Sequence, residues 1–344
     1  EVGHNALGSG QIISQGASLV NDAFESGDLF RSETWREIEQ RGQNGGTVHF
    51  VGLLSDGNVH SHIDHLLAML TRCRQVSIQQ VRIHCLLDGR DVDPRSAIGY
   101  VEQLETLLAD INSVDGFNYC VASAGGRMTI TMDRYEADWE MVRLGYETHV
   151  LGIGNPVRDV KAEIERQYGA SDDVTDQTLQ PFVVVDENGD PTGIMQDGDA
   201  VLLFNFRGDR AIEFSLSLES AQFDGFERPR HPEVFYCGML QYDGDLQIPS
   251  RYLVSPPVID NTMVENLCAE NLKSFAVSET QKFGHVTYFW NGNRSDYFDE
   301  SLETWVEIPS DRVAFNSKPA MKATEITDAT IELIQSSEYR FGRI

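Results

Sequence analysis

The chain has 344 residues, of which 41% are hydrophobic and 24% charged, proportions that are typical of folded globular proteins and exclude a disordered chain. Its 54 Asp and Glu residues against 27 Lys and Arg residues give a formal charge of -27, which argues against nucleic acid and anionic membranes as partners. The length predicts two domains, and no apolar run approaches the roughly 18 residues of a membrane span.

The N-terminal half has the pattern of an α/β protein. Residues 1–10 are rich in glycine and predict a loop. Residues 17–25 predict a helix that ends at Gly27, and the capping box formed by Thr34 and Glu37 predicts the start or an extension of the next helix. Three strands follow, each with a helix after it, at residues 48–54, 81–87 and 119–122. This alternation predicts right-handed crossovers and a mainly parallel sheet.

The C-terminal half continues the pattern and then changes composition. Its expected elements are a helix at residues 160–168, a hairpin excursion at 182–193, a strand beginning at Val201, a helix from Ala211 and a strand at 234–240. Consecutive prolines at positions 256 and 257 interrupt both helix and strand ladder, so a domain boundary is expected there. Beyond it we expect a helix at 261–270, a strand at 274–278, a polar loop at 279–285, a last strand at 305–308 and a last helix at 320–334.

The five cysteines are scattered along the chain and contain no Cys-x-x-Cys pair. An odd number of cysteines in largely apolar segments predicts free thiols rather than a disulfide framework. The pattern therefore predicts a reducing, cytoplasmic location.

Basic side chains follow four of the predicted strands. They are His60, Arg90, Arg127, Arg134, Arg207 and Arg210, and Asp91 accompanies Arg90. Ligands of open α/β sheets bind beyond the carboxyl ends of the strands, so these loops are expected to converge on one cationic pocket. Guanidinium groups match phosphate and carboxylate oxygens in bidentate fashion. The predicted ligand is a small anion that carries one phosphate and one carboxylate.

Each of these arginines has an alternative role in a structural ion pair, because acids such as Asp133 and Asp209 occur in the same loops. Their recurrence in three loops favours the anion. Like charges about 4 Å apart repel by on the order of 4 kcal/mol at an effective dielectric constant near 20, so the cluster is unfavourable without a counter-charge.

The histidines allow several interpretations. His60, His62 and His65 have poor spacing for one zinc site, so His60 is expected as a hydrogen-bond donor to substrate and His65 as a residue on a helix surface. His285, close to Lys282, stays open between a ligand contact and a core histidine.

Eight motifs, taken in order along the whole chain, resemble the cofactor-independent (2,3-bisphosphoglycerate-independent) phosphoglycerate mutases of the alkaline phosphatase superfamily. They are EVGHNALGSG, LLSDGNVHSHIDHL, LLDGRDV, GGRMTITMDRYEADW, FNFRGDRA, QYDGDL, SETQKFGHVTYFWNGNR and MKATEITDA. The resemblance implies interconversion of 3-phosphoglycerate and 2-phosphoglycerate through a phosphoserine intermediate. It also implies two divalent metal ions, Mn²⁺ or Mg²⁺, and no 2,3-bisphosphoglycerate.

Carried over by position, the resemblance makes eight residues bind substrate: His60, Arg90, Asp91, Arg127, Arg134, Arg207, Arg210 and Lys282. Asp91 matches a residue suspected of proton transfer to the substrate hydroxyl. The implied fold is an alkaline-phosphatase-like metal domain, incomplete here and formed by residues 1–15 and 256–344. A second α/β domain, the substrate-binding or phosphotransferase domain of residues 16–255, is inserted into it.

The same resemblance places the nucleophilic serine just before Glu1 and the metal ligands outside this chain, so no metal-binding residue is assigned here. A monomer with a small-molecule substrate is expected. Two alternatives stay open: a metal-dependent phosphatase or other sugar-phosphate mutase of the same superfamily, and, if the chain is complete, a non-catalytic fragment that binds phosphoglycerate.

Overall fold

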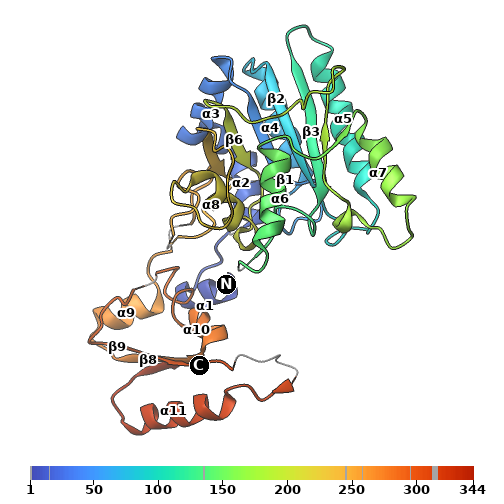
Figure 1. The fold of residues 1–344 in the computed structure, drawn as a ribbon. Helices are drawn as coiled ribbons and strands as arrows, with labels where there is room; N and C mark the ends of the chain where they lie inside the picture. Colours follow the sequence, from blue (N-terminus) through green and yellow to red (C-terminus); the bar gives the residue numbers. More distant parts are fainter. Residues whose placement is uncertain are drawn as a thin grey trace. The chain divides into compact units, whose positions relative to one another are not determined.

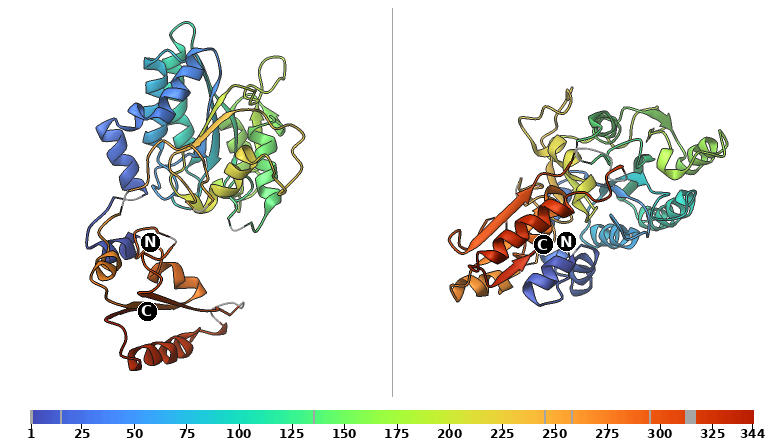
Figure 2. Two further views of the ribbon diagram at one scale, coloured as in Figure 1. Left: turned by 90° about the vertical axis from the view of Figure 1, so that its left-hand side faces the viewer. Right: turned by 90° about the horizontal axis from the view of Figure 1, so that it is seen from below.

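The computed structural model describes residues 2–14, 16–134, 136–244, 246–257, 259–294, 296–311 and 317–344. The chain divides into two compact units, unit 1 with Glu1–Gln15 and Pro257–Ile344, and unit 2 with Gly16–Pro256 (Figure 1, Figure 2). Unit 2 is continuous in sequence and separates the two segments of unit 1. The junctions lie within one residue of the expected boundaries, whereas the assignment of unit 1 to an interrupted phosphatase-like domain stays a prediction.

Unit 2 is built on a seven-stranded sheet with the strand order β4-β5-β3-β2-β1-β6-β7. Neighbouring strands are parallel except β3 and β5, which confirms the prediction of a mainly parallel sheet. The strands are β1 (Val48–Leu53), β2 (Gln80–Leu87), β3 (Asn118–Gly126), β4 (Asn155–Val157), β5 (Phe182–Val184), β6 (Ala200–Leu203) and β7 (Phe235–Gly238). Every residue of β1 and β6 is buried, as in a parallel sheet that is covered on both faces.

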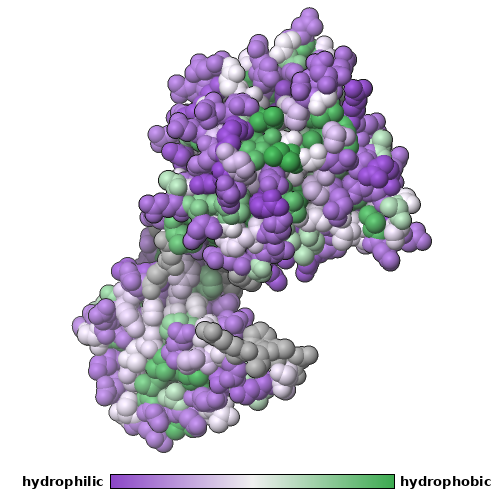
Figure 3. Space-filling model, in the orientation of Figure 1, coloured by the Kyte–Doolittle hydropathy of each residue, from purple (hydrophilic) through white to green (hydrophobic). Residues whose placement is uncertain are grey.

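Helices cover both faces of this sheet (Figure 1). They are α2 (Ala17–Ser26), α3 (Glu33–Gln43), α4 (Ile63–Gln75), α5 (Ala97–Asn112), α6 (Trp139–His149), α7 (Val160–Tyr168) and α8 (Ile212–Glu219), with 3-10 turns η1 (Leu29–Arg31), η2 (Asp176–Thr178) and η3 (Gly208–Arg210). Alternate residues of β1 enter separate cores, Phe50 with α3, α4 and α5 and Val51 with α6 and α8. Hydrophilic side chains predominate on the visible face of unit 2, as expected for this acidic chain (Figure 3).

Unit 1 contains a three-stranded parallel sheet with the order β10-β8-β9. Its elements are α1 (Val2–Ser9), α9 (Met263–Ala269), β8 (Ser274–Glu279), α10 (Thr280–Val286), β9 (Glu303–Ile308), α11 (Ala323–Gln335) and β10 (Phe341–Arg343). The buried Arg343 donates a hydrogen bond to Asn291 at 2.7 Å and lies 3.6 Å from Glu303, so a paired charge connects β10 to β9. Among the described residues, no helix is both long and apolar enough to cross a membrane.

Several sequence-based boundaries were wrong, each for a local physical reason. Residues 1–10 were expected as a loop, but Val2–Ser9 form α1; Gly8 permits close packing, because a Cβ there would lie 2.0 Å from the Trp290 carbonyl oxygen. Helix α3 begins after Ser32, whose side chain accepts a hydrogen bond from Trp35 N–H, so Thr34 lies inside the helix.

Two further corrections concern unit 1. Residues 279–285 were expected as a loop but contain most of α10. The strand at 305–308 is not the last one, because β10 follows α11 and pairs with β8. By contrast, the predicted end of α2 is confirmed, since Gly27 adopts the left-handed conformation with φ 71°.

A chain of five buried polar side chains crosses the interior of unit 2. Asp199 Oδ2 lies 3.2 Å from His49 Nε2, and His49 Nδ1 lies 3.0 Å from His84 Nε2. Ser123 Oγ lies 2.7 Å from His84 Nδ1 and 2.8 Å from His149 Nδ1. These contacts connect β1, β2 and β3 to helix α6, and all five side chains are buried.

The ionised carboxylate of Asp199 fixes the direction of these hydrogen bonds. Burial alone raises the pKa of Asp199, but hydrogen bonds from His49 and from the backbone of Gln196 and Thr47 bring the pKa below its ordinary value. His49 therefore donates through Nε2 and accepts through Nδ1, and each imidazole carries one proton. His149 Nε2 is then an acceptor without a hydrogen-bond partner in the described part of the chain.

We expect this histidine chain to make unit 2 sensitive to acid. Burial lowers the pKa of His49, His84 and His149, the last to about 3, from 6.5 in the unfolded chain. The unfolded state therefore binds more protons below pH 6.5, and the free energy of unfolding decreases as the pH falls through this window. For His149 the expected loss is about 2 kcal/mol between pH 6.5 and about pH 5, and His49 and His84 change the stability in the same direction; urea unfolding measures the total.

A His149→Gln variant provides the control for this prediction. It should be less stable at neutral pH, because Ser123 loses its partner, but its stability should depend less on pH than that of the parent chain. An unchanged pH dependence would show that His149 does not titrate with unfolding.

Candidate anion-binding site

The candidate site lies at the carboxyl ends of four neighbouring strands. In the order β3-β2-β1-β6, each strand is followed by a loop that carries residues expected in the site. The loops carry Arg127 and Arg134 after β3, Arg90 and Asp91 after β2, His60 after β1, and Arg207 and Arg210 after β6. The sheet order therefore brings together side chains that are up to 150 positions apart in the sequence.

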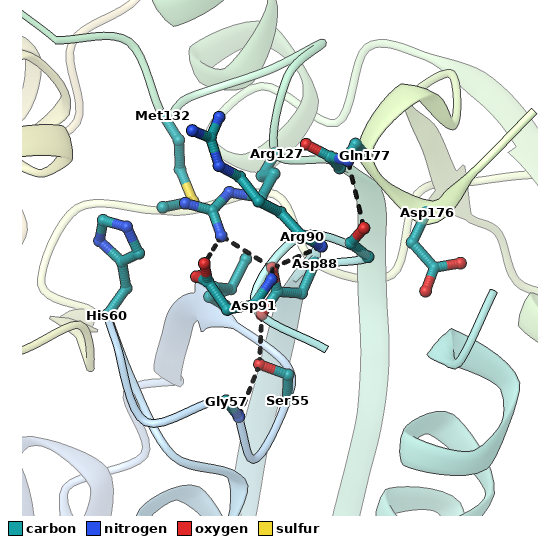
Figure 4. Close-up of polar contacts among 12 residues, drawn as sticks. Ser55, Gly57, His60, Asp88, Arg90, Asp91, Arg127, Met132, Asp176 and Gln177 are labelled. Carbon is teal, nitrogen blue, oxygen red and sulfur yellow. Dashed lines mark hydrogen bonds and ion pairs between the residues drawn. The ribbon is translucent and has the colours of Figure 1, made fainter. Parts of the chain in front are cut away.

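A buried ion pair connects the loops after β2 and β3. Arg127 Nη1 donates to Asp88 Oδ1 at 2.7 Å and to Asp91 Oδ2 at 2.5 Å, and only 1% of the Arg127 side chain is exposed (Figure 4). Asp88 Oδ2 accepts a hydrogen bond from the Ser55 hydroxyl at 2.6 Å, so the loop after β1 joins the same cluster. Arg127 Nε has no hydrogen-bond partner among the described residues.

The guanidinium groups are close enough to influence one another. Burial lowers the pKa of Arg210, and the positive charges of Arg134, Arg127 and Arg90 lower it further. Arg210 is held by a hydrogen bond from Nη1 to the Met132 carbonyl oxygen at 2.5 Å. Four arginines from three loops thus form one positively charged cluster, which an anion would stabilise.

The Arg90 side chain, in the loop after β2, is exposed. Its guanidinium has no dashed contact in Figure 4, whereas its backbone N–H donates to Asp88 Oδ1 at 3.2 Å. The backbone of Arg90 is therefore fixed while its charged group faces solvent.

Asp209 lies between two exposed arginines, Arg134 and Arg207. Its Oδ2 atom lies 3.0 Å from Arg207 Nη2 and 3.9 Å from Arg134 Nη1. Both arginines are exposed, so these ion pairs contribute little stability and can be exchanged for a ligand. The suggestion of a structural ion pair is thus correct for Asp209, whereas Asp133 instead accepts a hydrogen bond from the Asp138 backbone at 2.7 Å.

His60 is a buried, uncharged imidazole beside these charges. Burial lowers its pKa to about 4, with a further contribution from the positive charge of Arg127. Its Nδ1 atom lies 3.8 Å from Asp209 Oδ1, and neither atom has a hydrogen-bond partner in the described ranges. A neutral imidazole can donate a hydrogen bond to a ligand, or accept one from it, without adding charge to the site.

The other two histidines of this segment have structural roles. His62 is the N-cap of α4, where its Nδ1 atom accepts a hydrogen bond from Asp64 N–H. The expectation that His65 lies on a helix surface was wrong. It is 5% exposed, its Nε2 atom lies 2.7 Å from Asn21 Oδ1, and its ring stacks on Phe24.

The loop after β3 is held in a strained conformation against α6. Thr131 has φ 68°, which is rare for a β-branched residue, and its N–H donates to the Met141 carbonyl oxygen at 2.9 Å. A Cβ at Gly145 would lie 2.1 Å from Thr131 Oγ1 and 2.8 Å from Thr131 N. Helix α6 can therefore approach the loop only because residue 145 is glycine.

Lys282, the remaining predicted site residue, belongs to unit 1. It lies on α10, where its charge contributes, after burial, to a lowered pKa of His285. The His285 ring contacts the rings of His4 and Phe289, with centroid distances of 4.9 and 5.2 Å. His285 is thus partly packed, but it is not a buried core histidine.

Sequence reasoning missed three polar residues around the arginines. Asp88 and Ser55 were quoted within motifs but were given no role, although an Asp-Gly pair at a strand end is a turn signal. Gln177 had no sequence signal. Its side chain donates a hydrogen bond to the Gly89 carbonyl oxygen at 3.1 Å, and its backbone carbonyl oxygen accepts one from Met128 N–H at 3.0 Å.

The described residues do not provide a metal site. Among them, no group of three or more His, Cys, Asp or Glu side chains is placed to hold a metal ion. The two divalent ions implied by the resemblance therefore do not fit the residues described. All five cysteines lie within the described ranges and are free.

This geometry defines an α/β protein with a cationic site at the carboxyl ends of the strands of a mainly parallel sheet. Residues 20–244 match the family model described as BPG-independent PGAM N-terminus. A probable 2,3-bisphosphoglycerate-independent phosphoglycerate mutase of Leptospira interrogans is 49% identical over 100% of this chain and 63% of that protein. The 2,3-bisphosphoglycerate-independent phosphoglycerate mutase of Prunus dulcis is 47% identical over 100% of this chain and 70% of that protein.

A crystal structure of Leishmania mexicana phosphoglycerate mutase, described as obtained at low cobalt concentration, has the same fold. Its TM-score is 0.80 at 47% identity, over 99% of this chain and 62% of that chain. The chain therefore belongs to the family of 2,3-bisphosphoglycerate-independent phosphoglycerate mutases. It spans 63% of the length of the Leptospira relative.

We expect a Gly145→Ala substitution to destabilise unit 2 by about 1–3 kcal/mol, because the added methyl group overpacks the contact with the Thr131 backbone. Urea unfolding measures this change. The control is Gly99→Ala on α5, where no atom lies within 4 Å of the added Cβ and helix propensity should stabilise by up to about 1 kcal/mol. A Gly145→Ala chain as stable as the parent would refute the close approach of α6.

Proposed function

We propose that the intact protein interconverts 3-phosphoglycerate and 2-phosphoglycerate and that unit 2 holds the glycerate. The observation that carries this proposal is the cluster of arginines from three loops next to a buried neutral histidine, in a chain that belongs to this family. Phosphoglycerate carries both a phosphate and a carboxylate, which suits several forked donors at one site. His60, Arg90, Asp91, Arg127, Arg134, Arg207 and Arg210 are the proposed ligands in unit 2, and Lys282 is the proposed ligand in unit 1.

The proposed roles follow from the surroundings of each group. The exposed Arg90, Arg134 and Arg207 can move toward an incoming anion, while the buried Arg127 and Arg210 provide a fixed positive field. His60 provides a hydrogen bond without adding charge. Asp91 contacts Arg127 and is the proposed group for proton transfer with a substrate hydroxyl. Together they would keep glycerate bound and oriented while the phosphoryl group is on the enzyme.

We also propose that unit 1 is part of an alkaline-phosphatase-like metal domain into which unit 2 is inserted. The continuous unit 2 between two segments of unit 1 supports this arrangement. The nucleophilic serine and the ligands of two Mn²⁺ or Mg²⁺ ions are proposed to lie outside this chain. A cytoplasmic monomer that needs no 2,3-bisphosphoglycerate is proposed.

We predict that an Arg207→Ala substitution in the intact protein lowers turnover of 3-phosphoglycerate by about 10²-fold or more, as expected when a donor to the reacting anion is removed. Product analysis by NMR would distinguish 2-phosphoglycerate from the glycerate that a phosphatase releases. Near-normal turnover would rule out the role proposed for Arg207.

The matched control is Arg74→Ala. Arg74 forms an ion pair with Asp110 at 2.7 Å, in the last turn of α4 and away from the loops of the site. Turnover by the Arg74→Ala variant should equal that of the parent protein.

Titration of the chain itself with 3-phosphoglycerate, with and without Mn²⁺, tests the alternative of a fragment that binds 3-phosphoglycerate but does not convert it.

A further inference from the structure

Asp88 makes more polar contacts in the site than any one of the residues to which we assigned ligand roles, yet it has no role in the proposed function. Its Oδ1 atom accepts hydrogen bonds from Arg127 Nη1 at 2.7 Å, Asp91 N at 3.1 Å and Arg90 N at 3.2 Å. Its Oδ2 atom accepts from Ser55 Oγ at 2.6 Å (Figure 4). One carboxylate thus joins the loops that follow β1, β2 and β3.

Asp88 is buried, and burying a carboxylate that has no role in the structure or the site would be unfavourable. It is 2% exposed, and a buried carboxylate is stable only where donors compensate for its lost hydration. Here two backbone N–H groups, one hydroxyl and one guanidinium provide that compensation. The carboxylate is therefore held as an anion within a site that is proposed to bind an anion.

Asp88 has two opposite effects on the affinity of the site for an anion, Coulomb repulsion and the positioning of donors. A fixed negative charge repels a bound phosphoglycerate, so by charge alone the site would bind its ligand more tightly without Asp88. The carboxylate also holds Arg127 in one orientation and fixes the backbone that carries Arg90 and Asp91, and an aligned donor binds an anion more strongly than a mobile one. The contacts favour the second effect.

We propose that Asp88 is the positioning residue of the anion site: it aligns Arg127 and the segment Arg90–Asp91 for phosphoglycerate without touching the ligand itself. Ser55 supports it by orienting the second carboxylate oxygen. This inference rests on the proposed function, since it names the residue on which the same site depends.

The test compares the affinity of the chain for 3-phosphoglycerate, by isothermal titration calorimetry, with those of Asp88→Ala, Asp88→Asn and Ser55→Ala variants. Asp88→Ala removes all four contacts and should weaken binding at least about tenfold. Asp88→Asn keeps an acceptor for Arg127 but loses the charge, and Ser55→Ala frees only Oδ2, so both should weaken binding by about threefold or more. Equal or tighter binding by Asp88→Ala and Asp88→Asn would overturn the proposal.

Asp199→Asn is the matched control for stability. Asp199 is also a buried carboxylate, with hydrogen bonds from Thr47 N, Gln196 N and His49. It lies at the amino end of β6, whereas the site lies at the carboxyl ends of the strands. This variant should lose stability and keep the parent affinity. If it loses affinity as much as Asp88→Asn, Asp88 acts only through folding and the proposal fails.

A second measurement separates this inference from the proposed function. The Arg127 Nη1–H signal in nitrogen-15 NMR, assigned with Arg127→Lys, should exchange slowly with solvent in the parent chain and in Asp199→Asn, and rapidly in Asp88→Ala, because Nη1 donates to Asp88. A parent chain that does not bind 3-phosphoglycerate refutes the proposed function, while this signal still tests the alignment by Asp88. Slow exchange that persists in Asp88→Ala would overturn the inference even where binding is observed.

Discussion

The buried contact between the Arg127 guanidinium and the Asp88 carboxylate holds the loops of the site together. Like charges that gather at the carboxyl ends of the strands repel one another, and burial together with the neighbouring guanidinium charges lowers the pKa of Arg210. The carboxylates of Asp88, Asp91 and Asp209 offset part of it through contacts with Arg127, Arg134 and Arg207. They leave the exposed guanidinium of Arg90 without a dashed contact in Figure 4. The acids stabilise the cluster, but they do not neutralise all of its positive charge.

The same strands carry a second polar network, which lies within the core. The chain from Asp199 through His49, His84 and Ser123 to His149 ties α6 to three strands, and α6 in turn packs on the strained loop that carries Arg127 and Arg134. Buried polar networks specify one arrangement because a half-satisfied network is more costly than an apolar core. The neutral imidazoles in the core thus stabilise the packing of α6 on the strands, whereas the orientation of the site side chains depends on ion pairs at the carboxyl ends of the strands.

Much of unit 2 could be predicted from sequence because its signals are local. The apolar runs of β1, β2 and β6 and the glycine that ends α2 need no distant partner. The rule that ligands bind at the carboxyl ends of strands selected arginines that the structure places in one cluster. The contacts that were missed are long-range. Asp88 meets Arg127 across 39 positions, and Gly8 meets Trp290 only in the folded unit, so α1 looked like a loop. Residues 279–285 looked polar and irregular because α10 buries only Val286.

Binding of a dianionic ester by several guanidinium groups at one edge of the sheet is the basis of the whole interpretation. A crystal structure of the chain with 3-phosphoglycerate tests it. We expect the phosphate and carboxylate groups within hydrogen-bond distance of guanidinium nitrogens from at least two of the loops after β2, β3 and β6, with Asp209 released from Arg207 or Arg134. Ligand bound elsewhere, with these arginines still paired to their acids and the carboxyl edge of the sheet free of ligand density, would contradict the account.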